Sequence, residues 1–348
     1  MFSIRDFGAM SMCAELLSVR DLSVSFVTEA GVTRVLDAVS LTLAKGEIMG
    51  LVGESGCGKT TLARAILGAL PANASVQGGT LMFDGRDLLS LNTAVLTEQV
   101  RGRTITFVPQ DPYSSFSPLF TVGDQITELM RWKSPARRAG ERSYSRHRRQ
   151  ADRARVLTLL HSVQLAEPEA LLRKYPHELS GGQRQRVMIA MALLPEPKLV
   201  IADEPTTALD VTIQAQTLQL LRRLTTEHGI SVLFATHDLG TAWEICDRIA
   251  VMYAGQELEA APVAEFFHAP MVPYARLLLN SLPSSGSPLD GIAGEVPNLI
   301  APPAGCRFHP RCPRASTTCC EQRPLTRELR QAHQVRCHHP FLQPVVAV

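Results

Sequence analysis

The sequence predicts an α/β fold in which a parallel sheet carries a phosphate-binding loop. An apolar run at 48–52 is followed by a glycine-rich segment at 53–60 and by a helix-like stretch at 61–67. Two further runs, at 199–202 and 230–235, have the length and apolar character of buried strands. Strand, glycine loop and helix in this order form a cradle for a phosphate group. We therefore expect the chain to bind a nucleoside triphosphate.

The loop residues have the chemistry that a phosphate group needs. Glycines let backbone N–H groups turn toward one anion, and the following helix adds the positive end of its dipole. Lys59 is placed to hold the outer phosphates, and Thr60 to hold a magnesium ion. The alternative is a tight strand-to-helix turn that binds nothing. The predicted nucleotide-binding residues of the loop are Gly53, Glu54, Ser55, Gly56, Cys57, Gly58, Lys59, Thr60 and Thr61.

A Ser-Gly-Gly segment at 179–183 begins a second helical run, which continues to residue 194. Such a segment is an anion site, although on its own it is more often a plain helix cap. The run at 199–202 then ends in Asp203 and Glu204, which would lie near the phosphate loop in a parallel sheet. Asp203 can hold magnesium and Glu204 can act on water.

In this order the sequence resembles the ATP-binding cassette (ABC) ATPase family over residues 16–260. The ordered elements are the phosphate loop, Gln110, the Ser-Gly-Gly signature, the acidic strand, the Asp210 loop and His237. The resemblance implies a P-loop NTPase cassette at 16–262. Its parts would be a RecA-like core, an antiparallel β subdomain and a helical subdomain at about 111–195.

The family mechanism implies a role for each matching residue. Glu204 would be the general base for the water that attacks the γ-phosphate, and His237 would contact that phosphate. Gln110 would reach both the magnesium ion and the water. The implied magnesium ligands are Thr60, Gln110 and Asp203. Phe26 matches the position where the family stacks an aromatic ring, more often Tyr, on adenine; the alternative for Phe26 is an ordinary core residue.

The signature implies a partner, because in this family it completes the nucleotide site of the opposite cassette. The residues concerned are Ser180, Gly181, Gly182, Gln183 and Asp210. One phosphate loop and one signature occur in these 348 residues, so a functional unit needs a second cassette from another chain. Closing around ATP and opening after hydrolysis would be the power stroke.

Composition is ordinary for a soluble globular protein, with 45% hydrophobic and 20% charged residues. No apolar run approaches the roughly 18 residues that span a bilayer. Residues 1–15 lack the apolar core of a signal peptide, and we expect them to be disordered, with Met10 or Met12 as alternative starts. A formal charge of +2 does not indicate a nucleic-acid partner. The Arg-rich segment at 131–155 is interpreted as a solvated helix face or flexible insertion.

Cysteines gather near the C-terminus, where five of the eight follow residue 305. Such clustering in a cytosolic protein indicates a metal rather than disulfides. The preceding segment is rich in Pro and Gly. We therefore expect a linker wrapping the cassette at 263–304 and a separate Cys-rich, metal-binding extension at 305–348.

This extension resembles the C-terminal extension of ABC ATPases that drive oligopeptide, dipeptide and related importers. In that subfamily four cysteines can hold an iron-sulfur cluster of the 4Fe-4S type. Matching by spacing selects Cys306, Cys312, Cys319 and Cys337, and leaves Cys320 spare. Four thiolates suit tetrahedral zinc equally well. Free cysteines in a loosely ordered tail are the remaining alternative.

The resemblance implies the ATP-hydrolysing subunit of an importer for di- and oligopeptides, peripheral on the cytoplasmic face of the bacterial inner membrane. Its partners would be a second, similar ATPase in a heterodimer, two transmembrane permease subunits and an extracytoplasmic substrate-binding protein, with no nucleic acid. Nickel or metal-chelate complexes and glutathione-like compounds are alternative cargoes. A regulatory subunit that hydrolyses little is disfavoured by Glu204 and His237. A soluble ABC ATPase in translation or DNA repair is an alternative from another class, although this chain shows neither a second cassette nor long coiled coils.

Overall fold

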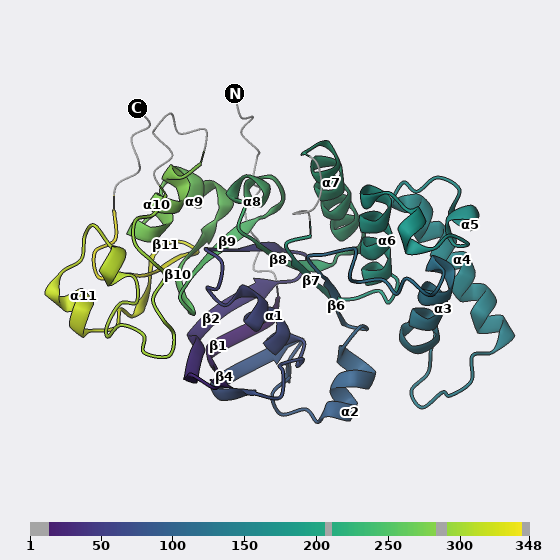
Figure 1. Cartoon of the computed structure of the whole chain (residues 1–348), viewed down its shortest axis with the longest axis horizontal. Coiled ribbons are helices and arrows are strands. Elements are labelled where there is room, and N and C mark those ends of the chain that lie inside the picture. The colour runs from purple at the N-terminus through teal and green to yellow at the C-terminus, as the bar shows by residue number, and fades with distance from the viewer. Residues whose placement is uncertain (1–13, 206–210, 283–290, 343–348) are drawn as a thin grey trace.

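The structure, a computed structural model, describes residues 14–205, 211–282 and 291–342. Asp210 and most of the expected disordered N-terminus, at 1–13, lie outside these ranges. Figure 1 shows a central sheet with helices on one side, a smaller antiparallel sheet on the other and a helical subdomain at one end. Within the described ranges, no helix is both long enough and apolar enough to cross a membrane.

A main sheet runs through the centre of the molecule (Figure 1). Its strands are β3 (Ile48–Val52), β6 (Ile105–Val108), β7 (Leu199–Asp203), β8 (Ser231–Thr236), β9 (Arg248–Tyr253), β10 (Gln256–Pro262), β11 (Thr326–Arg330) and β12 (His333–Arg336). Among the described residues it has eight strands, in the order β11-β12-β10-β9-β3-β8-β7-β6. The pairs among β6, β7, β8, β3 and β9 are parallel, and those that add β10, β12 and β11 are antiparallel. The phosphate loop after β3 therefore shares an edge with the carboxyl ends of β7 and β8.

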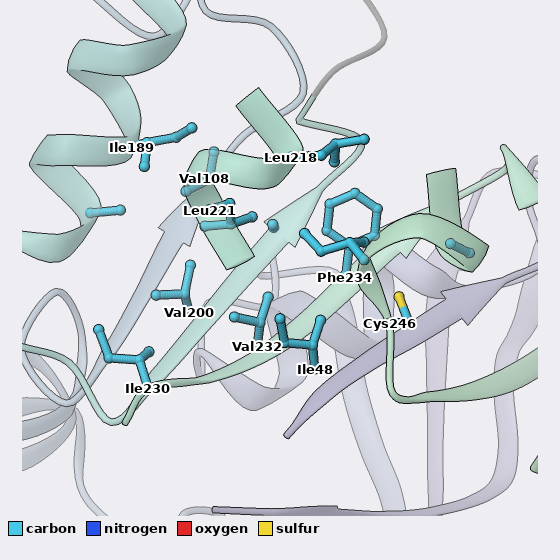
Figure 2. Packing of buried hydrophobic residues seen from close by; sticks show 14 of the residues in the cluster. Ile48, Val108, Ile189, Val200, Leu218, Leu221, Ile230, Val232, Phe234 and Cys246 are labelled. Atoms are coloured by element: carbon cyan, nitrogen blue, oxygen red, sulfur yellow. The ribbon is translucent and has the colours of Figure 1, made fainter. Parts of the chain in front are cut away.

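Side chains of the main sheet alternate between two cores. On β3, Ile48 and Val52 belong to the core beneath the helices, whereas Met49 and Leu51 belong to the core shared with the antiparallel sheet. The helices over the first core include α6 (Gly181–Leu193), α7 (Val211–His228) and α8 (Leu239–Ile245). Figure 2 shows this packing for Ile48, Val200, Val232, Phe234, Leu218 and Leu221. Because both faces are buried, the central strands read as continuous apolar runs, which explains their visibility in the sequence.

The antiparallel sheet packs against the main sheet through the second core. Its strands are β1 (Glu15–Thr28), β2 (Gly31–Ala44), β4 (Ala74–Phe83) and β5 (Arg86–Asp87), in the order β2-β1-β4-β5. Helix α1 (Lys59–Ile66) contributes Leu62 and Ile66 to the same core. The short helix α2 (Thr93–Val95) and a π-helix, Leu96–Val100, then lead back to β6. This is the antiparallel β subdomain that the sequence predicts.

The helical subdomain contains α3 (Val122–Lys133), α4 (Arg146–Ser162), α5 (Pro168–Leu171), a 3₁₀ turn (Pro176–Glu178) and α6. Most arginines of its Arg-rich part are exposed, as the sequence analysis expects, and Arg137 and Arg148 are buried exceptions. The Arg148 side chain is 7% exposed and lies 2.7 Å from a carboxylate oxygen of Glu141. Arg148 also stacks over the ring of Tyr144, 4.5 Å from its centroid. Acidic and aromatic neighbours inside the same segment pair with this arginine, which lets the helix bury it.

The C-terminal part packs on the cassette more closely than a linker and a separate extension would. Residues 263–304 begin with α9 (Val263–His268) and α10 (Pro273–Asn280), whose Phe266 and Tyr274 side chains are fully buried. Strand β12 pairs with β10. Helix α11 (Thr317–Glu321) precedes β11 and β12 in the sequence. Strand β10 would otherwise offer unpaired backbone groups at a sheet edge; β12 pairs with part of that edge, and β11 in turn pairs with β12. The extension is thus continuous with the main sheet rather than separate from it.

Candidate functional site

The phosphate loop joins β3 to α1 in a conformation that requires glycine. Gly53 and Gly58 have φ angles of 151° and 108°. A Cβ atom at Gly53 would lie 2.1 Å from the carbonyl oxygen of Met252, so no larger residue fits there. Lys59 is buried, and its Nζ donates to the carbonyl oxygens of Gly53 (2.7 Å) and Glu54 (3.3 Å). The loop backbone therefore fixes the lysine ammonium at the mouth of the cradle.

Thr60 and Asp203, the two residues expected to hold magnesium, lie within hydrogen-bond distance of each other. The Thr60 hydroxyl donates to Oδ2 of Asp203 over 2.9 Å. Asp203 ends β7 and is 7% exposed. Burial raises the pKa of its carboxyl group, with a further increase from the charge of Glu204, while the hydrogen bond from Thr60 opposes the shift. A hydroxyl and a carboxylate are the hard oxygen ligands that Mg²⁺ prefers, so these two residues fit that ion.

Glu204 is held at both of its carboxylate oxygens. Gln110 Nε2 donates to Oε2 over 2.9 Å, and His237 Nδ1 lies 2.8 Å from Oε1. The Glu204 backbone has a φ angle of 47°, and its N–H donates to the carbonyl oxygen of Ala235 over 2.8 Å. This left-handed turn at the end of β7 is an uncommon conformation for a non-glycine residue and points to a functional constraint. The structure thus brings together the three predicted catalytic residues.

One cleft of about 550 Å³ collects these groups. It is lined by Val35, Ser55, Gly56, Gly58, Lys59, Thr60, Thr61, Gln110, Asp203, Glu204 and His237. Three predicted loop residues, Gly53, Glu54 and Cys57, do not line it. The Cys57 thiol is buried, which raises its pKa, and the Glu54 carboxylate pairs with Arg311 in the C-terminal segment. Val35 of β2 is a lining residue that the sequence analysis did not identify.

Other predicted residues lie away from this cleft. Phe26 on β1 is half-buried, packs against the core shared by the two sheets and does not line the cleft. Ser180 caps α6: the Gln183 N–H donates to its Oγ over 3.2 Å, and its own N–H donates to Gln183 Oε1 over 3.1 Å. The signature at 180–183 is likewise absent from the cleft lining, and Asp210 lies outside the described residues.

Comparison with known proteins identifies the family. The model described as "ABC transporter" matches residues 36–207, and the model described as "Oligopeptide/dipeptide transporter, C-terminal region" matches residues 258–319. The chain is 46% identical over 327 residues to a probable peptide ABC transporter ATP-binding protein of Sinorhizobium fredii, covering 92% of this chain and 94% of that protein. The chain belongs to the ATP-binding proteins of ABC transporters.

Two further relatives of this ABC protein carry transport names. The dipeptide transport ATP-binding protein DppD of Bacillus subtilis is 41% identical, with 93% of this chain and 94% of that protein covered. The oligopeptide transport ATP-binding protein OppD of Salmonella typhimurium is 42% identical, with 89% and 90% covered. The resemblance expected from the sequence is therefore confirmed.

Solved structures confirm the cassette fold. The ATP-binding cassette MJ0796, in a dimeric post-hydrolysis state bound to ADP and Pi, superposes with a TM-score of 0.60 at 28% identity and covers 71% of this chain and 99% of its own. The cbiO1 protein of Clostridium perfringens superposes with a TM-score of 0.59 at 28% identity, covering 73% and 90%. With its family and cleft established, this ABC protein is an ATPase.

The four cysteines predicted as metal ligands line one small pocket of the C-terminal segment. The pocket contains Cys306, Cys312, Cys319 and Cys337 together with His309, His338 and His339. Across the part of the chain that the structure describes, however, no three His, Cys, Asp or Glu side chains are arranged to hold a metal ion. The four-thiolate centre is therefore not formed in this structure. Cys337 Sγ instead accepts the N–H of His339 over 3.3 Å, and Cys319 Sγ lies 3.5 Å from the hydroxyl of Ser316.

Burial raises the pKa of three of the four thiols. It raises the pKa of Cys306 to about 11 and that of Cys337 to about 12, and it raises the pKa of Cys312 as well. Neighbouring thiolates add to each shift, which means that the groups are close enough to repel one another when charged. A metal bound here would have to displace protons from the thiols. Cys320 is exposed and does not line the pocket, as its interpretation as a spare cysteine requires.

Proposed function

We propose that this chain is the ATP-hydrolysing subunit of an importer for dipeptides and oligopeptides. The observation that carries the proposal is the Glu204 carboxylate held between Gln110 and His237 in the cleft that contains Lys59. The match to the oligopeptide/dipeptide C-terminal region supports the transport class, and the names of the relatives support a peptide cargo.

ATP binding would use the loop as the sequence predicts. The backbone N–H groups and the N-terminal end of α1 receive the phosphates, and Lys59 holds the outer ones. Thr60, Asp203 and Gln110 would hold magnesium, which when bound neutralises charge between the β- and γ-phosphates. The Thr60 hydroxyl, which now donates to Asp203, is then free to turn toward that ion. Val35, which lines the cleft, is the candidate to contact the adenosine part of the nucleotide. For Phe26, which lies outside the cleft lining, a contact with adenine rests on the family resemblance alone.

Hydrolysis would begin at Glu204. Its carboxylate accepts a proton from the attacking water as that water bonds to the γ-phosphorus and the bond to the β-phosphate oxygen breaks. Gln110 orients the carboxylate through Oε2, and His237 through Oε1. His237 is 55% exposed in the cleft, which leaves its ring able to reach the γ-phosphate.

A second cassette would complete each site. Ser180, Gly181, Gly182, Gln183 and Asp210 are proposed to contact the nucleotide held by the opposite chain. The capping box uses the N–H groups of Ser180 and Gln183, and the start of α6 that it shapes lies away from the chain's own cleft. We propose a heterodimer with a similar ATPase, which closes on ATP and opens after hydrolysis.

Membrane partners would dock on the helical subdomain. Tyr113, Leu119 and Phe120 follow Gln110 and are 58%, 79% and 56% exposed. Exposed apolar side chains this close in sequence to a catalytic residue are suited to binding a partner. A change in the partner's conformation could then be transmitted to the cleft. We propose that two transmembrane permease subunits bind here, with an extracytoplasmic substrate-binding protein on the far side. The chain would then lie peripherally on the cytoplasmic face of the bacterial inner membrane, without a nucleic-acid partner.

For the cysteine pocket we propose a 4Fe-4S cluster, with zinc as the alternative. Four thiols around one pocket are the donor set that either group uses. Cys319 Sγ lies beside the Ser316 hydroxyl and Cys337 Sγ accepts from the His339 N–H, and the bound group would replace these contacts. When bound, the cluster would join residues 306 and 337 across the C-terminal segment and stabilise it.

Uptake by the native host tests the cargo. A strain that lacks this chain should lose uptake of a radiolabelled tripeptide, and the wild-type chain should restore it whereas Glu204→Gln should not. Unchanged tripeptide uptake in the deletion strain would contradict the peptide assignment. Loss of ⁶³Ni or of labelled glutathione uptake instead would select one of the alternative cargoes. Growth defects without any uptake defect would favour a soluble ABC ATPase.

A further inference from the structure

The C-terminal segment contacts the phosphate loop directly at Glu54. Arg311 Nη1 donates to Oε2 of Glu54 over 2.8 Å, and Nη2 donates to Oε1 over 3.1 Å. The Arg311 side chain is 4% exposed and the Glu54 side chain 28%. Two parallel N–H···O bonds to one carboxylate fix direction as well as distance. An arginine 257 positions away in sequence therefore holds the second residue of the loop.

Arg311 is itself held rigidly. Its Nε donates to the carbonyl oxygen of Ala293 over 2.9 Å, and Nη2 donates to that of Ile292 over 2.8 Å. Nη1 also donates to the Tyr253 hydroxyl over 3.3 Å. A guanidinium with its donors used on several sides cannot follow a moving partner. Glu54 must therefore stay where Arg311 holds it.

A second contact fixes the backbone of Glu54. Its N–H donates to the hydroxyl of Tyr274 over 3.0 Å. The rings of Tyr274, Tyr253 and Phe308 pack against one another with centroids 4.7 to 5.1 Å apart, and all three are buried. Phe308 belongs to the same turn as Arg311, so both contacts with Glu54 depend on how residues 306–312 are folded.

Glu54 in turn determines the position of Lys59. The Lys59 ammonium donates to the carbonyl oxygens of Gly53 and Glu54. Tyr274 holds the N–H of the Gly53–Glu54 peptide to which the first of these carbonyls belongs, and Arg311 holds the Glu54 side chain. We propose that Arg311 is a positioning residue for nucleotide binding, which sets the geometry of the phosphate loop through Glu54. ATP binding is common to the ABC family, so this role does not depend on the cargo or on the group in the cysteine pocket.

Equilibrium binding of MgATP to the full-length chain tests this role. Arg311→Ala should raise both Kd and KM for MgATP by about tenfold and leave kcat within about twofold, since it removes a contact equally important in the ground state and the transition state. Arg311→Lys should fall between Ala and wild type, because an ammonium cannot make the bidentate contact. Arg330→Ala is the matched control: this arginine of the same segment donates to the carbonyl oxygen of Leu342, and its loss should leave Kd unchanged.

A double-mutant cycle separates positioning from simple anchoring of the C-terminal segment. If Arg311 acts through Glu54, then Arg311→Ala should add no further loss of affinity in a Glu54→Gln background. Additive losses would overturn the proposal, as would wild-type affinity in Arg311→Ala. If Arg311→Ala fails to fold, the Kd of Glu54→Gln for MgATP tests the proposal by itself, because this substitution keeps the shape of the side chain and weakens the ion pair with Arg311. A Kd within twofold of wild type in that variant would overturn the proposal equally.

Discussion

The nucleotide cleft and the cysteine pocket are assembled by different means. Cleft side chains come from separate strands and loops, yet Thr60 already contacts Asp203 and Gln110 already contacts Glu204. The cysteines come from one stretch, 306–337, and line one pocket without taking up a metal-binding arrangement within the described residues. Parallel strands fix the first set through their backbone ladder, whereas the proposed thiol site would need a bound group to complete it. The cleft is thus preformed at the strand ends, and the cysteine site is not.

The largest expected effect is on the preformed site. Glu204→Gln should lower ATP hydrolysis by about 100- to 10 000-fold, because it removes a general base, and should leave ATP binding intact. Steady-state phosphate release and an equilibrium ATP titration measure the two quantities. Glu295→Gln, which changes an exposed carboxylate outside the cleft, should hydrolyse ATP at the wild-type rate. Hydrolysis at more than a tenth of the wild-type rate in Glu204→Gln would contradict the role of Glu204.

The next effect concerns magnesium. Thr60→Val removes the hydroxyl that contacts Asp203 and should weaken MgATP binding by about tenfold, equal to about 1.4 kcal/mol. ATP binding measured in EDTA should change little, because that measurement does not involve the ion. Thr158→Val, which removes a hydroxyl bonded to the helix backbone, is the control. An equal loss of affinity with and without magnesium would mean that Thr60 contributes to loop shape alone.

Substitutions in the cysteine pocket should change the metal content of the chain more than its ATPase activity. Cys312→Ser should lower bound iron or zinc from about one group per chain to near zero and should lower the melting temperature. Cys320→Ser, at the exposed neighbour of Cys319, should leave both unchanged. Metal analysis and the visible absorption of the purified chain distinguish a cluster from zinc. Full metal retention with unchanged stability in Cys312→Ser would remove these residues as ligands.

The smallest effect is a pH dependence where the two regions join. Glu257 of β10 is fully buried, which raises its pKa to about 7 from 4.5, and Arg336 of β12 and Arg248 oppose that shift. A carboxyl group with a raised pKa favours the folded state at low pH, and this contribution is lost as the pH rises through 7. Glu257→Gln should therefore be more stable than wild type at pH 8, by about 1 kcal/mol, and not at pH 5. Thermal unfolding at both pH values checks this, and an advantage independent of pH would contradict the shift.

Much of the cleft could be predicted because its signals are local. Gly53 to Thr60, the pair Asp203–Glu204 and His237 each follow a buried strand directly, and parallel strands bring such positions to one edge. The fold of the cassette was predictable for the same reason, since its central strands are continuous apolar runs. Phe26 was chosen by analogy of position, and the structure places Val35 rather than Phe26 along the cleft.

Contacts between segments far apart in the sequence could not be predicted, because no local sequence pattern indicates them. The polar strand His333–Arg336 becomes part of the main sheet because β10 offers an edge, and nothing within its own residues indicates that partner. In the sequence, Arg311 is marked only by its position next to Cys312. Its contact with Glu54 depends on how the whole C-terminal segment folds back onto the cassette. Arg148 is buried for a similar reason, because Glu141 lies within reach once α4 has formed.

Affinity purification of this chain from detergent-solubilised membranes of its native host, followed by mass spectrometry of the retained proteins, tests the importer function most directly. We expect two polytopic membrane proteins and a second, similar ABC ATPase, all retained by the wild-type chain and by Arg330→Ala. Ribosomal or DNA-repair proteins in their place, with no membrane protein retained, would contradict the importer while leaving the ATPase site intact.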